Sequence, residues 1–115
     1  MGQKTFTTTF QPINPVDAKN FLDTLHSEPD ISLGDDSMYG EPFGEFVYGF
    51  LEPLGYDVDL ASDGNLEVLD IDDQGVVNGK YVVTFDDGQE TNLEFKGFVA
   101  QGDGYKLIVI TEINW

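Results

Sequence analysis

Apolar and polar residues alternate along the second half of the sequence, from Tyr56 to Ile113. This period of two places successive side chains on opposite faces of the backbone, which is typical of strands that bury one face. The pattern predicts five successive antiparallel strands, at residues 56–62, 65–72, 80–85, 91–100 and 105–113. Turn-forming residues separate these strands, at residues 63–64, 78–79, 86–88 and 102–104.

The last two turns predict the register of the strands that they join. A two-residue turn at 102–103 places Phe95 opposite Ile110. A three-residue loop at 86–88 places Tyr81 opposite Leu93. Although the two turns are interpreted independently, both registers collect apolar residues on the same face, which we expect to form the core. These core residues are Tyr81, Val83, Phe85, Leu93, Phe95, Val99, Ile108 and Ile110.

Two helices are expected before the strands. Residues 15–27 should form the first, because Asn14 can cap it, Pro15 suits its first turn and apolar residues follow at helical spacing. Residues 42–52 should form the second, whose apolar stripe consists of Phe43, Phe46, Val47, Phe50 and Leu51. Residues 28–42 are interpreted as a loop, and residues 4–10 as an N-terminal edge strand.

These elements predict one α+β domain over residues 1–115. In this domain two helices pack on one face of a curved antiparallel sheet of about five to six strands. A chain of 115 residues can bury a core of its own without disulfides, and the sequence contains no cysteine.

The charge of the chain limits its partners. Twenty-two Asp and Glu residues face five Lys and no Arg, so the formal net charge is −17. Such a surface repels nucleic acid and anionic membranes, which are themselves negative, and it attracts basic proteins. The N-terminus lacks the features of a signal peptide and no run of apolar residues is long enough to span a membrane, so we expect a soluble, cytoplasmic protein.

One stretch of the sequence resembles a metal-binding motif. Asp70, Asp72, Gln74 and Gly75 match the first half of an EF-hand calcium loop, but the twelfth position is Tyr81 and the flanking segments have the period of strands. The stretch therefore predicts acids at a strand end and a turn, with no metal site. The single histidine, His26, has no nucleophile at a recognised spacing, so we expect no catalytic residues and no cofactor.

Three groups of residues are candidates for binding a basic partner. Glu41, Glu45, Tyr48 and Glu52 lie on the face of the second predicted helix opposite its apolar stripe. The loop before that helix adds Asp35, Asp36 and Tyr39, and the calcium-like stretch adds Asp70, Asp72 and Asp73. Carboxylates steer a basic partner toward the surface, and exposed tyrosines anchor it.

We expect a small non-catalytic inhibitor that binds the basic nucleic-acid-binding surface of a partner, such as a nuclease. In composition and size the chain resembles the phage-encoded mimics of nucleic acid that act as antirestriction or anti-CRISPR proteins. An immunity protein that covers a basic nuclease toxin fits the same properties. Both possibilities imply fast, salt-sensitive association with a basic enzyme.

Two alternatives remain open. The first is a ligand-binding or enzymatic domain of cystatin-like or NTF2-like architecture from a salt-adapted organism, in which Tyr39, Tyr48, Tyr56 and Trp115 would line a pocket. The second is a phage structural or assembly component that associates through the edge strand at 4–10. A continuous acidic face favours the inhibitor, whereas scattered acids around a deep pocket favour the ligand-binding domain.

Overall fold

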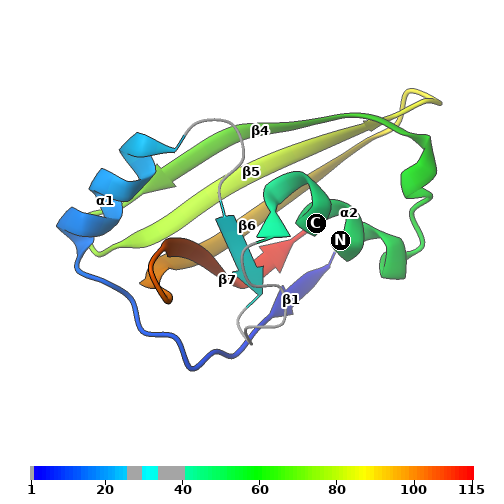
Figure 1. The fold of residues 1–115 in the computed structure, drawn as a ribbon. Coiled ribbons are helices and arrows are strands. Elements are labelled where there is room, and N and C mark those ends of the chain that lie inside the picture. The colour runs from blue at the N-terminus through cyan, green and yellow to red at the C-terminus, as the bar shows by residue number, and fades with distance from the viewer. Residues whose placement is uncertain (1, 26–29, 34–40) are drawn as a thin grey trace.

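The computed structural model describes residues 2–25, 30–33 and 41–115, and it has an α+β fold (Figure 1). Its elements are β1 (Gln3–Thr5), α1 (Pro15–Thr24), β2 (Asp30–Leu33), β3 (Glu41–Pro42), α2 (Phe43–Leu51), the 3-10 turns η1 (Glu52–Leu54) and η2 (Val58–Leu60), β4 (Ala61–Ile71), β5 (Val76–Phe85), β6 (Glu90–Gln101) and β7 (Lys106–Asn114). The sheet is open, its order is β3-β2-β7-β6-β5-β4, and β1 also pairs with β7. All neighbours are antiparallel except β2 and β7.

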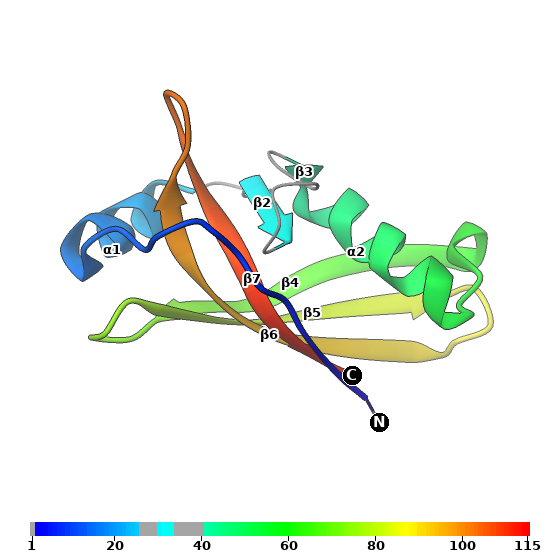
Figure 2. The ribbon, with the colours of Figure 1, turned by 90° about the horizontal axis from the view of Figure 1, so that it is seen from below.

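Both helices cover the same side of β4, β5 and β6, with α1 near one end of these strands and α2 near the other (Figure 2). The predicted α+β arrangement, with two helices on one face of the sheet, is confirmed. All eight residues that the sequence assigned to the core face are buried. From the helices, Ala18, Phe46, Val47 and Leu51 complete this core. Neither helix, nor any other within the described residues, is long and apolar enough to cross a membrane.

The register between β5 and β6 is the predicted one, with Tyr81 opposite Leu93. Between β6 and β7 the prediction is wrong, because Phe95 lies opposite Ile113 rather than Ile110. The turn falls at 103–104, one position later than expected, and a bulge at Lys96 shifts the pairing again. Moving the turn by one residue shifts the pairing by two, and a shift of two leaves every side chain on its own face. The bulge adds the third position, and its extra residue on β7, Thr111, keeps Ile113 on the core face. The residues predicted for the core face are therefore correct, although the predicted partner of Phe95 is wrong.

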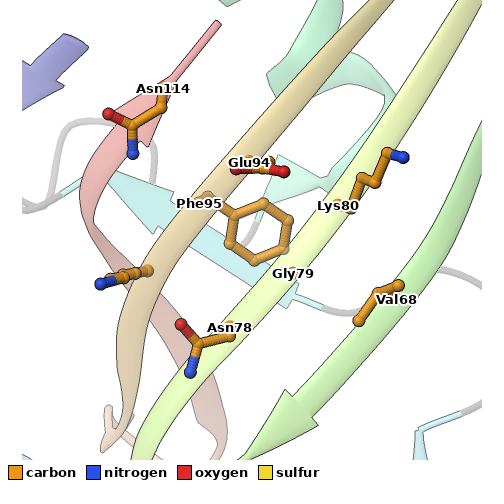
Figure 3. Close-up of a pocket in the computed structure, with 8 residues that line it drawn as sticks. Val68, Asn78, Gly79, Lys80, Glu94, Phe95 and Asn114 are labelled. Carbon is orange, nitrogen blue, oxygen red and sulfur yellow. The ribbon is translucent and has the colours of Figure 1, made fainter.

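Two of the predicted turns are wrong, and both lie inside strands. Residues 63–64 belong to β4, which is one strand of 11 residues rather than two strands, and residues 56–60 contain η2 instead of a strand. Residues 78–79 belong to β5. At Gly79 the ring of Phe95 lies against the backbone, in the space where a Cβ atom would stand (Figure 3). The glycine therefore serves close packing instead of a turn.

The turn between β4 and β5 falls instead at residues 72–75, inside the stretch that resembles a calcium loop. One carboxylate oxygen of Asp72 accepts hydrogen bonds from the backbone N–H groups of Gln74 and Val76, each at 2.9 Å. Gly75 follows with φ of 88°, the left-handed conformation that glycine adopts without strain. The prediction of acids at a strand end and a turn is confirmed.

The segments on the far side of β7 also differ from prediction. Part of the predicted loop at 28–42 forms β2 and β3, and Ile31 and Ser32 of β2 are fully buried. The predicted edge strand at 4–10 is shorter, since β1 spans only three residues. Phe10 packs farther along against Leu107 and Val109, on the outer face of the sheet. Short strands of this kind carry too few residues to show a period.

The helices begin and end close to their predicted bounds. Asn14 caps α1 as expected, because its side-chain oxygen accepts the N–H of Asp17 at 2.9 Å. The helix ends at Thr24 rather than at residue 27, and Leu25 is already extended. His26 lies outside the described residues. The second helix, α2, continues into η1, and Gly55 ends it with φ of 98°.

Candidate functional site

The predicted partner-binding residues of α2 do not all face solvent. Glu45 and Glu52 are exposed, as expected. Tyr48 is half-buried and packs against the core, which corrects its assignment as an exposed anchor. Its hydroxyl oxygen lies 3.0 Å from the position that a Cβ of Gly64 would take, so the side chain reaches over β4. Glu41 lies in β3, opposite Ile31 of β2.

The other predicted groups are separated from α2. Asp35, Asp36 and Tyr39 lie outside the described residues. Asp70, Asp72 and Asp73 lie at the turn between β4 and β5, at the end of the strands near α1, whereas α2 lies near the other end (Figures 1 and 2). The molecule is 43 Å long and 25 Å wide, so one small patch cannot include both groups.

A line of carboxylates connects the two ends along β4. We call it the acidic edge and define it as Asp57, Asp59, Asp63, Glu67, Asp70, Asp72 and Asp73. All seven residues are exposed. They follow η2, β4 and the turn after it, and β4 is the last strand in the order of the sheet. The sequence missed this arrangement, because the predicted turn at 63–64 divided the segment into two strands.

The acidic edge extends at its η2 end into the turn between β5 and β6. The backbone N–H of Asp86 donates to the carbonyl oxygen of Leu60 at 2.8 Å, which holds Asp86 and Asp87 beside η2. Two aliphatic side chains stand among these acids, since Leu60 is 44% exposed and Val68 is 41% exposed. The edge therefore combines negative charge with apolar contact points.

Some of these carboxylates have structural roles and others do not. Asp72 shapes the turn, and the carboxylate of Asp57 accepts the N–H of Asp59 at 3.2 Å at the start of η2. Glu67 forms the one ion pair found within the described residues, with Lys80 at 3.7 Å. The carboxylates of Asp63, Asp70 and Asp73 make no such contact with described residues. They are free to interact with a partner.

The outer face of the sheet, away from the helices, has a different character. A shallow depression of about 260 Å³ crosses its strands, and its lining includes Val68, Asn78, Lys80, Glu94, Lys96 and Asn114 (Figure 3). Across the strands Asn78 pairs with Lys96 and Lys80 with Glu94, so opposite charges and amides alternate. The surface around this depression is charge-balanced, as is common for the open face of an antiparallel sheet, whereas the end of the same face near Phe10 is apolar.

No group of three or more His, Asp or Glu side chains within the described residues is arranged to hold a metal ion. No family model matches the sequence, and no curated protein or solved structure is detectably similar to it. The chemistry of the acidic edge is therefore the basis for the function proposed next.

Proposed function

We propose that this protein is a small non-catalytic inhibitor that binds the basic nucleic-acid-binding surface of another protein through its acidic edge. The observation that carries the proposal is the continuity of the edge. Seven exposed carboxylates lie between residues 57 and 73, and only that of Glu67 is neutralised by an ion pair with a described residue. A surface of one sign attracts basic partners over a Debye length of about 8 Å at physiological salt.

The spacing of the charges supports mimicry of a nucleic acid. Three of the carboxylates, those of Asp63, Glu67 and Asp70, lie on β4 itself, and a strand rises about 3.3 Å per residue, so they cover roughly 23 Å. One strand of DNA carries a phosphate about every 3.4 Å. The linear charge density along β4 is thus roughly a third of that of a DNA strand. This density favours rapid association that weakens steeply with salt.

Leu60 and Val68 would take the anchoring role that the sequence gave to tyrosines. Charges at an interface mainly direct association and specificity, whereas affinity is concentrated in a few well-packed side chains. Both aliphatic residues are exposed next to acids of the edge. A complementary partner would therefore present basic side chains around a small apolar surface.

The observed packing favours the alternatives less. The face of the sheet under the helices is filled by core side chains, and Tyr56 stacks on Phe85 at a centroid distance of 5.8 Å rather than lining a cavity. Assembly through the N-terminal strand would rest on β1, which is only three residues long and therefore offers few backbone groups for pairing. Acids on an exposed edge strand also prevent unwanted strand pairing, and the experiment below separates that role from partner binding.

The test compares three forms of the protein as bait in host lysate at low and moderate salt. The edge variant carries Asp63→Asn, Asp70→Asn and Asp73→Asn, which leave the hydrogen bonds of Asp72 intact. The control variant carries the same change of charge away from the edge, as Asp23→Asn, Asp30→Asn and Glu94→Gln. We expect the wild type and the control to retain a basic nucleic-acid-binding protein that DNA or RNA displaces. The edge variant should bind it at least about tenfold more weakly.

Equal weakening in both variants would assign the binding to total charge and not to the edge. A basic partner that the edge variant binds as tightly as the wild type would overturn the proposed surface. If no basic protein is retained at either salt, the inhibitor function itself is wrong. Sedimentation of the edge variant tests whether the acids only prevent unwanted strand pairing. If that is their role, the variant should dimerise, because its β4 edge has lost three charges.

A further inference from the structure

A second candidate site lies away from the acidic edge, in an apolar groove of about 230 Å³ between α2 and the N-terminal segment. Helix α2 and η1 contribute Phe46, Gly49, Phe50, Pro53 and Leu54 to its lining. The N-terminal segment contributes Lys4 and Phe6. Three aromatic rings and two aliphatic side chains thus surround a space that a small apolar group could occupy.

Among the described residues that line the groove, one side chain is charged, and it is a cation. Lys4 is exposed, and its ammonium nitrogen lies 5.2 Å from the centre of the Phe6 ring. In a chain with 22 acidic residues and five lysines, it is notable that no carboxylate stands among the described residues of this lining. The positive charge of Lys4 favours an anionic ligand in the groove and disfavours the basic partner proposed for the acidic edge.

Gly49 lines the groove and has no side chain. A Cβ atom at Gly49 would have no atom within 4 Å, and Gly49 lies inside α2. Glycine inside a helix costs about 1 kcal/mol relative to alanine. The helix therefore forgoes this stability at a position that lines the groove together with Phe46 and Phe50.

We propose that this groove binds an amphipathic carboxylate of medium chain length. The hydrocarbon tail would lie against Phe6, Phe46 and Phe50, and the carboxylate would pair with the ammonium group of Lys4. A volume of about 230 Å³ holds seven or eight groups of the size of a water molecule, at roughly 30 Å³ each, which corresponds to a chain of about eight carbons. The site goes beyond the proposed function and does not depend on it.

The protein contains its own reporter for this site. Trp115 is the only tryptophan, and its ring meets that of Phe50 edge-on at a centroid distance of 5.5 Å. A ligand that packs against Phe50 should change the environment of Trp115. Binding can therefore be followed by tryptophan fluorescence on the full chain without a label.

The experiment titrates the protein with octanoate, 1-octanol and octylammonium, which share a tail and differ in the charge of the head group. We expect a saturable change with octanoate and the weakest binding with octylammonium. Lys4→Gln should weaken octanoate binding about two- to fivefold, which is the range for an exposed ion pair. The same variant should leave the affinity for 1-octanol unchanged. Gly49→Leu should abolish binding of octanoate and octanol by filling the groove, whereas Gly49→Ala serves as its smaller matched control.

Three results would overturn the proposal. These are the absence of a saturable response to octanoate, octanoate binding that equals octylammonium binding, and full binding by Gly49→Leu. Thermal melts of the Gly49 variants check that they are folded. Lys4 is exposed, so Lys4→Gln leaves the core unchanged, and its effect on octanoate binding reports the loss of the charge.

Discussion

The sheet ends in different ways on its two sides. On one side β7 is paired twice, with β2 along residues 108–110 and with β1 along residues 112–114. On the other side β4 ends the order of the sheet, and its exposed residues include many carboxylates. Two short strands, β1 and β3, therefore end the sheet on the first side, and the long, acid-bearing strand β4 ends it on the second. Short strands and charge are two of the ways in which an exposed sheet edge avoids pairing with another chain.

The largest difference between the two edges should appear in the stability of the fold. Ile31→Ala removes a fully buried side chain from β2 and should lower the free energy of unfolding by about 2–5 kcal/mol. Val68→Ala on β4 removes a side chain that is 41% exposed and should change it by about 0.5 kcal/mol or less. Urea unfolding measures both, and equal losses would contradict the difference in burial between the two edges.

A smaller effect should follow when the cover of β7 is removed. Deleting residues 2–5 removes β1 and the pairing of Gln3 with Asn114, and we expect a loss of about 1–3 kcal/mol in unfolding free energy. The end of β7 then presents unpaired backbone, so the truncated protein should self-associate in sedimentation experiments. A truncated protein that is monomeric and as stable as the wild type would show that β7 needs no cover.

The smallest effect concerns the one ion pair found within the described residues. Lys80→Gln removes its contact with Glu67, and both side chains are more than a third exposed, at 37% and 44%. The cost should be about 0.2–1 kcal/mol at low salt and should vanish in 0.5 M NaCl. Lys96→Gln is the matched control, because it changes the net charge equally and Lys96 has no ion pair with a described residue. Identical results for the two variants would show that the pair contributes nothing.

Part of the fold is predictable from local sequence alone. Period-two alternation located β5, β6 and β7 and sorted their residues onto the correct faces, and Asn14 marked the start of α1. The errors concentrate in β4, where two register shifts interrupt the pairing. Gly64 and Gly79 were assigned to turns, but aromatic side chains occupy the space beside them. A ring supplied by another element leaves no signal near the glycine that it covers.

The candidate site was predicted in its parts but not in its arrangement. The acids at the turn after β4 were correctly placed on a turn, and Glu45 and Glu52 are exposed on α2 and η1. Tyr48 was misassigned, because helical spacing alone does not show how far toward the sheet a helix is rotated. The acidic edge depends on β4 being continuous and last in the sheet, and both properties follow from long-range pairing.

The two ends of the described chain meet on the sheet, and this has a topological consequence. Gly2 and Trp115 exchange two backbone hydrogen bonds, with N···O distances of 2.7 and 2.9 Å. A short linker between them should close the chain into a circle without disturbing the core, and the exposed turn at 86–88 can supply new termini. In such a circular permutant β1 and β7 would become neighbours in sequence as they are in space, and both new ends would lie beside the acidic edge.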